Sequence, residues 1–339
     1  MPSFDNHSFD VHQVDELLDF IARLLGFTPN NSAVLVGITA DSTIAAIGRM
    51  TLASSADELH AELRTATASL SSTGVTRVVL VGYGYEQLVR VTLDAVRESL
   101  RAAGIRAEGA IRVNGDHFWL LAGQALRATT PAVHYQPGTS AAAAAAVAAG
   151  LVALPDRETL VATLAPVTGL DREHMSAATA HAEQALATLL HDAATSEGPA
   201  SSAAQQSRAH QAGITLLSEV EQLYRAGKTA DDSQAASLSI LLTVLTVRDA
   251  AVQRCSGDDW QRAMWIDLLR RAEPRYSAAP AGLVALCALY DGWGPLAGIA
   301  LARALEADPG YRFAQLMADA MAAGVPPHII TDGLRDGQI

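Results

Sequence analysis

The stretch from Arg77 to Gly82 constrains the fold of this chain more than any other. Its centre is Val-Val-Leu-Val, and such an uninterrupted aliphatic run is typical of a strand that is buried on both faces of a sheet. The turn Gly82-Tyr83-Gly84 leads from it into a helical pattern over 86–102. A buried strand that feeds a helix predicts an α/β layer in which helices cover the sheet.

The segments around this strand alternate between helical and extended patterns. A helix is expected over 11–27, then a hairpin over 33–52 and a helix over 54–70. A second hairpin is expected over 110–121, turning at an Asn-Gly pair, and an alanine-rich helix follows over 140–149. This order predicts a mixed sheet with helices on its faces.

Past residue 193 the chain changes character. Residues 193–212 contain the run Thr195-Ser196-Glu197-Gly198-Pro199, followed by Ser201-Ser202 and Gln205-Gln206, and predict a flexible linker or insertion. From residue 213 onward, apolar stripes at helical spacing recur with short connections, which predicts a helical bundle or a short solenoid. We therefore expect an α/β domain with a mixed sheet over 1–192 and an all-helical domain over 213–339.

One helical segment resembles half of a tetratricopeptide repeat. It runs from Gly294 to Tyr311 and carries Ala300, Ala304 and Pro309 at the spacing of the second repeat helix. Small residues at this spacing also occur in any tight helical hairpin, and a peptide-binding array needs several stacked units. The sequence leaves both interpretations open.

The charge balance argues against nucleic acid as a partner. The formal net charge is −12 over 339 residues, so the overall field repels a phosphate backbone. Acidic residues interrupt the densest basic spots, which we interpret as solvated helix faces. These spots are Arg254 with Arg262, and Arg270 with Arg271 and Arg275.

The two cysteines and the lengths of the apolar runs indicate the cellular compartment of the protein. Cys255 and Cys287 have no metal ligands at suitable spacing, and we interpret them as core residues. The lack of a disulfide framework fits a reducing cytoplasm. No basic segment precedes an apolar stretch near the N-terminus, and the longest apolar run, over 141–154, is too short to cross a bilayer. We expect a cytoplasmic protein without a membrane partner.

An ordered set of short stretches runs along most of the chain. They are 24–29 with Ser32, the strand end at Tyr83-Gly84, 145–150 leading to 154–158, 246–250, and 290–292 followed by 304–311 and Pro326-Pro327. Together they resemble the actinobacterial family called "domain of unknown function 4192". The resemblance implies an actinobacterium or one of its phages as the source, and no known activity.

This chain departs from that family at one position of interest. Many members follow the tryptophan of the second hairpin with a cysteine cluster that suggests metal. Here Trp119 is followed by Leu120 to Gly123, with no cysteine. Metal ligation by thiolates is therefore not expected at this hairpin.

The turn after the strongest strand is the first place where a ligand is expected. Backbone N–H groups at a helix start attract anions, and ligands collect beyond the carboxyl ends of parallel strands. The ligand-binding residues predicted here are Gly82, Tyr83, Gly84, Tyr85 and Glu86. Gln87 replaces the third glycine of a dinucleotide fingerprint, and no phosphate-binding lysine follows. A tight turn that needs glycine only for packing is the alternative.

The second hairpin adds His117 and Trp119 to this predicted ligand site, and the loop beyond it adds His134. A histidine held by a carboxylate can act as a general base, and Asp116 precedes His117. Neighbours on a strand point to opposite faces, so we expect that Asp116 does not orient His117. A polar hairpin tip without chemistry is the alternative.

In the helical half, Arg248 and Asp249 close an apolar helix and are predicted to contact a protein partner, together with Trp293. The alternative is a structural salt bridge across the bundle. In that case the expected partners of Arg248 are Asp258, Asp259 or Asp267.

Metal and catalytic arrangements are not predicted. His174 and His181 lie seven residues apart, a spacing that metal sites rarely use. No serine lies in a nucleophile elbow, and neither cysteine has a base nearby in sequence. No cofactor is expected, and whether the chain is an enzyme stays open.

Three functions are compatible with these patterns. The first is a non-catalytic binding, scaffold or regulatory protein that contacts a protein partner. The second is an enzyme or sensor for a small anionic ligand, such as a nucleotide, at the turn from Gly82 to Glu86. The third is self-assembly, since apolar helical faces and tryptophans often form subunit interfaces.

Overall fold

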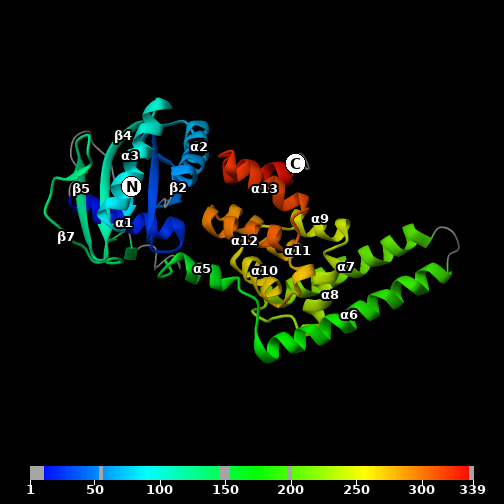
Figure 1. The fold of residues 1–339 in the computed structure, drawn as a ribbon. Coiled ribbons are helices and arrows are strands. Elements are labelled where there is room, and N and C mark those ends of the chain that lie inside the picture. Colours follow the sequence, from blue (N-terminus) through cyan, green and yellow to red (C-terminus); the bar gives the residue numbers. More distant parts are fainter. Residues whose placement is uncertain (1–10, 53–55, 142, 145–152, 197–200, 336–339) are drawn as a thin grey trace. The chain divides into compact units, whose positions relative to one another are not determined.

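The computed structural model describes residues 11–52, 56–141, 143–144, 153–196 and 201–335 (Figure 1). The chain divides into two compact units, one of Met1–Leu160 with Ala320–Pro326 and one of Val161–Asp319 with Pro327–Ile339. We call them the α/β unit and the helical unit. The boundary lies near residue 160, whereas the sequence predicted it near 192, because a long helix that begins at Gly169 packs with the helices that follow it.

The α/β unit is built on one mixed sheet. The strands run in the spatial order β2-β1-β3-β4-β5-β6, and β7 pairs with β5 beside β6. Only the β3–β4 pairing is parallel among these strands. The strands are β1 (Ser32–Thr39), β2 (Ile44–Thr51), β3 (Val75–Tyr83), β4 (Arg106–Asn114), β5 (His117–Ala122), β6 (Arg127–Ala128) and β7 (Val133–His134). The predicted mixed sheet, with both hairpins, is confirmed.

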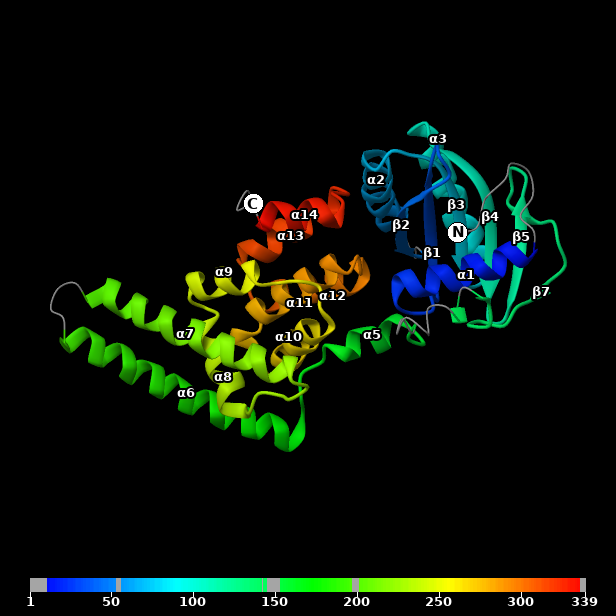
Figure 2. The ribbon, with the colours of Figure 1, turned by 180° about the vertical axis from the view of Figure 1, so that it is seen from behind.

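Helices cover both faces of this sheet, as the two opposite views show (Figures 1 and 2). α1 (Val11–Leu25) lies across one face, and α2 (Ala56–Ser72) and α3 (Glu86–Ala102) lie on the other. Val78 to Val81 are fully buried in the inner strand β3, as predicted. Side chains alternate between the faces, so Leu80 belongs to the core under α2 and α3.

The second hairpin turns one residue later than expected. Asn114 and His117 are cross-strand partners, so the two-residue turn is Gly115-Asp116 and not the predicted Asn-Gly pair. Gly115 has a φ of 62°, the left-handed conformation that such a turn requires. Glycine, and not asparagine, therefore occupies the first central position.

The helical unit surrounds one central helix. α11 (Ala278–Tyr290) is buried along its length from Ala278 to Leu289. The other helices here are α6 (Gly169–Ser196), α7 (Ser201–Arg225), α8 (Asp232–Leu241), α9 (Leu245–Gln253), α10 (Asp259–Arg271), α12 (Gly294–Ala307), α13 (Arg312–Ala322) and α14 (Pro327–Arg335), with a 3₁₀ turn at Pro274–Tyr276. By this division α5 (Arg157–Thr163) and the end of α13, from Ala320, belong partly to the α/β unit. This all-helical architecture confirms the predicted fold class.

The stretch expected to be a flexible linker is largely helical. α6 continues to Ser196 and α7 begins at Ser201, so most of 193–212 lies inside two long helices that pack together (Figure 2). Ala and Gln favour helix, and packing between α6 and α7 further stabilises the helices here. Several predicted features lie outside the described residues, namely most of the alanine helix over 140–149, Ser54 with Ser55, and residues 197–200.

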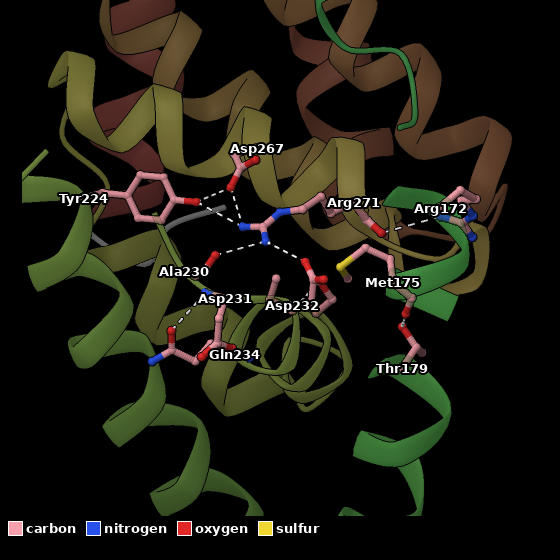
Figure 3. A network of polar contacts seen from close by, with 12 residues as sticks. Arg172, Met175, Thr179, Tyr224, Ala230, Asp231, Asp232, Gln234, Asp267 and Arg271 are labelled. Carbon is pink, nitrogen blue, oxygen red and sulfur yellow. Dashed lines mark hydrogen bonds and ion pairs between the residues drawn. The ribbon is translucent and has the colours of Figure 1, made fainter. Parts of the chain in front are cut away.

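A largely buried arginine, Arg271, joins three helices of this unit (Figure 3). Arg271 of α10 is only 12% exposed and forms an ion pair with Asp267. Its Nη1 donates to the carbonyl oxygen of Ala230 at 3.0 Å, and its Nη2 donates to the Tyr224 hydroxyl at 3.3 Å. Asp232 lies 3.4 Å from Nη1. The interpretation of Arg271 as part of a solvated face is therefore wrong, because its position in sequence does not reveal these long-range partners.

The two cysteines of the chain lie close together in the helical unit. Cys255 and Cys287 are both buried, as predicted, and their sulfur atoms lie 3.0 Å apart as free thiols.

Among the described residues, no single helix is long and apolar enough to cross a bilayer. α8 and α9 reach that length and hydropathy only together, across a bend of 105°.

Candidate functional site

Two adjoining pockets lie at one edge of the sheet, one where β3 and β4 end and the other where β2 ends. The first, which we call the tyrosine pocket, has a volume of about 420 Å³ and is lined by Thr28, Asn30, Tyr83, Gly84, Asn114, Tyr135 and Asp156, among others. The second, which we call the Arg49 pocket, has a volume of about 410 Å³ and is lined by Phe27, Asn30, Asn31, Arg49, Thr51, Asp156, Arg157 and Glu158. Asn30 and Asp156 line both pockets. This is the edge of an α/β sheet at which ligands usually collect.

Local backbone geometry builds the shared wall of the pockets. Asn31 has a φ of 43°, which asparagine tolerates better than most residues, and its N–H bonds to the Asn30 side chain at 2.9 Å. On the other side, the Thr28 N–H donates to Leu154 and the Leu154 N–H donates to Gly26. These bonds bring Asp156 to the pockets from a distant part of the sequence.

Two buried hydroxyls face α1 at this end of the sheet. Tyr83 and Ser32 are cross-strand partners, and both side chains are buried. Neither the Tyr83 hydroxyl nor the Ser32 hydroxyl has a hydrogen-bond partner among the described residues. A buried hydroxyl without a partner costs about 1 to 3 kcal/mol. Tyr83 also lines the tyrosine pocket, and a polar atom without a partner at a pocket is a candidate contact for a polar ligand.

The environment of the two tyrosines keeps them neutral. Burial raises the pKa of Tyr83 well above its ordinary value of 10.0, and Tyr135 and Asp19 act in the same direction. Burial, followed by Asp19, also raises the pKa of Tyr135 to about 12. Both hydroxyls therefore remain protonated at physiological pH and can donate hydrogen bonds.

A carboxylate of α1 fixes the loop that carries Tyr135. Asp19 is buried, and its two oxygens accept hydrogen bonds from the N–H groups of Gly138 at 2.8 Å and Ser140 at 3.2 Å. The Tyr135 N–H donates to the carbonyl oxygen of Asp116 at 2.9 Å. The Tyr135 wall of the tyrosine pocket is thus held from both sides.

The comparison with known proteins rests on one match. The model of the family described as "Domain of unknown function (DUF4192)" matches residues 15–328. The chain belongs to this family. Neither a curated protein nor a solved structure matches it significantly. The family description assigns no activity, so the geometry of this DUF4192 chain is what bears on function.

In this DUF4192 chain the predicted glycine turn divides into two parts. Tyr83 and Gly84 line the tyrosine pocket, but Gly82, Tyr85 and Glu86 are not among the residues that line it. A Cβ on Gly82 would lie 2.3 Å from Val89 of α3, so this glycine permits close packing between strand and helix. The Gly84 N–H donates to Val113 at 2.8 Å and is not available to an anion.

Arg112, which was not predicted as a site residue, links several of the predicted ones. The guanidinium lies 4.1 Å from the centre of the Trp119 ring, its Nε donates to the Gly84 carbonyl oxygen at 3.3 Å, and its Nη1 is 3.5 Å from Glu86. The cross-strand pairing of Arg112 with Trp119 places these groups together. The sequence did hold one signal for this role, because Arg112 is a charged residue within the otherwise apolar strand expected over 110–113.

The expectation that Asp116 does not orient His117 is wrong. His117 Nδ1 lies 2.7 Å from one Asp116 oxygen, and His134 Nε2 lies 3.3 Å from the other. Asp116 lies in the turn and not in the strand, so alternation of side chains does not apply to it. The hydrogen bond from His117 lowers the pKa of Asp116. Neither histidine is among the residues that line the tyrosine pocket.

The predicted partner-binding residues of the helical unit do not form one cluster, since Arg248 and Asp249 contact each other and Trp293 contacts a different arginine. Arg248 pairs with its neighbour Asp249 at 2.6 Å, whereas Asp267 pairs with Arg271 and Asp259 pairs with Arg262. The predicted salt bridge from Arg248 to Asp258, Asp259 or Asp267 is therefore wrong, because Arg248 pairs with Asp249 instead. Trp293 instead lies under the guanidinium of Arg262, at 5.8 Å.

Within the described residues no group of three or more His, Cys, Asp or Glu could hold a metal ion. His174 and His181 of α6 are both exposed.

Proposed function

We propose that the α/β unit binds a small polar ligand with an anionic group, of which a nucleotide is the best-fitting class. One observation carries this proposal: Tyr83, which lines the pocket at the carboxyl edge of the sheet, has a buried hydroxyl without a partner among the described residues. Each pocket has the volume of an ordinary small-molecule site.

The two pockets favour different parts of such a ligand. The tyrosine pocket offers the amides of Asn30 and Asn114 and the rings of two tyrosines, which suit a neutral polar ring system. The Arg49 pocket adds the guanidinium groups of Arg49 and Arg157, which suit a phosphate or carboxylate, beside the carboxylates of Asp156 and Glu158. This division supports an anion at the Arg49 pocket and not at the glycine turn.

Tyr83→Phe gives a test that distinguishes a ligand site from a structural tyrosine. Removal of a hydroxyl that has no partner should leave the ligand-free protein equally stable or raise its melting temperature. The same change should weaken binding of nucleoside monophosphates, measured as a ligand-induced rise in melting temperature. A loss of stability in the ligand-free variant would show that the hydroxyl has a structural partner and would contradict the proposal.

A matched pair of surface variants locates the site. Asn114→Ala removes an exposed amide that lines the tyrosine pocket, whereas Gln87→Ala removes an exposed amide of α3 that does not line either pocket. The nucleotide-induced shift should fall in the first variant and be unchanged in the second. Equal shifts in both variants would place the ligand elsewhere.

Other functional expectations stay predictions. A scaffold or self-assembling protein is distinguished by light scattering of the purified chain, which reports its oligomeric state. The family resemblance further leads us to infer an actinobacterial or phage source and a cytoplasmic location.

A further inference from the structure

A third pocket lies wholly within the helical unit, and neither the family description nor the proposed function accounts for it. Its volume is about 490 Å³. It forms where the α8–α9 connection, the 3₁₀ turn at Pro274–Tyr276, the start of α11 and the α12–α13 connection meet. We call it the Arg312 pocket.

Three arginines line the Arg312 pocket, against a single carboxylate, that of Asp308. Asp308 accepts a hydrogen bond from Gly310 at 2.9 Å within its own turn. Arg312 donates to the neutral side chain of Gln315 at 3.2 Å and has no carboxylate partner among the described residues. Arg248 pairs with Asp249 and Arg275 pairs with Glu183, both acids lying outside the lining, so Arg312 is the arginine here whose charge no carboxylate neutralises by direct contact.

The other two arginines are held in place but keep free donors. Arg248 bonds to Asp249 through Nε and Nη2, and its guanidinium lies 5.9 Å from the centre of the Tyr311 ring. Arg275 bonds to Glu183 through Nη2. A guanidinium carries five N–H donors, so each arginine can still present donors to an oxyanion.

The remaining lining is apolar and aromatic. Tyr276 and Tyr311 contribute rings, and Leu245 is 62% exposed at this pocket. An exposed leucine beside arginine donors favours a ligand that has both an apolar part and a charged part. Burial raises the pKa of Tyr311 to about 12, so its hydroxyl stays neutral beside the arginines.

We infer that the Arg312 pocket binds an organic anion, in which a carboxylate or phosphate group is attached to an apolar or aromatic body. The oxyanion contacts Arg312 and Arg248, and the apolar body lies against Tyr276 and Leu245. This site is separate from the nucleotide site proposed for the α/β unit, since the two share no residue.

Calorimetric titration of the full chain with phenyl phosphate and phenylacetate tests this inference. At least one of these probes should bind saturably with one molecule per chain. Benzyl alcohol, which lacks the charge, and inorganic phosphate, which lacks the ring, should each bind at least about tenfold more weakly. Absence of saturable binding by both aromatic anions, or equal binding of inorganic phosphate, would overturn the inference.

Variants assign the binding to this pocket. Arg312→Gln should weaken binding of the aromatic anion about tenfold, because a charge-assisted hydrogen bond is lost at the exposed first residue of α13. Arg208→Gln, on α7 and outside the pocket, is the matched control and should bind normally. Asn114→Ala should also bind normally, which separates this site from the tyrosine pocket. Unchanged affinity in Arg312→Gln would overturn the assignment.

Discussion

The guanidinium of Arg112 lies 4.1 Å from the centre of the Trp119 ring and at the same time donates to the carbonyl oxygen of Gly84. A single side chain thereby connects the hairpin of β4 and β5 to the turn that leads into α3. Because Gly84 lines the tyrosine pocket, Arg112 positions one wall of the proposed ligand site without lining it.

Arg112→Gln removes both interactions and should destabilise the α/β unit by about 1 to 2 kcal/mol. Urea unfolding followed by circular dichroism measures this change. Arg127→Gln, on the exposed strand β6, is the control and should change stability by less than about 0.5 kcal/mol. Equal stability of the Arg112 and Arg127 variants would show that the Arg112 contacts contribute nothing.

Gly82→Ala should destabilise the chain by about 1 to 3 kcal/mol, because the added Cβ would lie 2.3 Å from Val89 and force strand and helix apart. Gly298→Ala is the opposite case. No atom lies within 4 Å of the added Cβ, and alanine favours helix, so this variant should gain up to about 1 kcal/mol. Thermal unfolding of both variants compares them, and a stable Gly82→Ala would refute the packing role of this glycine.

Alkaline pH should destabilise the α/β unit through Tyr135. The pKa of Tyr135 is about 12 in the folded protein and near 10.0 in the unfolded chain, so the unfolded chain loses its proton first. Stability is therefore complete below pH 10 and decreases between pH 10 and 12, by at most about 3 kcal/mol. In Tyr135→Phe the decrease should be smaller, but not abolished, since Tyr83 also titrates. An identical pH dependence of urea unfolding in both proteins would contradict this account.

Arg271→Met should destabilise the helical unit by about 2 to 3 kcal/mol, because it leaves Asp267 without its buried partner and removes the bond to Ala230. Arg270→Met changes the adjacent, exposed arginine and should cost less than about 1 kcal/mol. Urea unfolding of the two variants provides the comparison. If both lose the same stability, the network around Arg271 has no special role.

The sequence predicted those parts of the fold that depend on local patterns. The buried strand around Leu80, the helix over 86–102 and the mixed sheet all follow from periodicity and turn residues, and the structure confirms them. The helix over 201–225 was predicted only from residue 213, and its start was taken as a flexible linker or insertion, because the packing of α7 against α6 is a long-range contact that local patterns do not reveal.

The candidate site was only partly predictable for a related reason. Tyr83 and Gly84 adjoin the strongest strand, and their position at a strand end could be inferred. Asn30, Tyr135 and Asp156 reach the same pocket from segments far apart in the sequence. The partners of Asp116 and Arg112 likewise depend on the register of the second hairpin, which shifts by one residue from the expected turn.

The central claim, a ligand site at the tyrosine pocket, is tested most directly by calorimetric titration of nucleoside monophosphates into the full chain and into Tyr83→Phe. The account predicts saturable binding of at least one nucleotide, one per chain, and a clear loss of affinity in the variant. The claim would be contradicted if no nucleotide gave binding heat, or if Tyr83→Phe bound the nucleotide as tightly as the parent chain does.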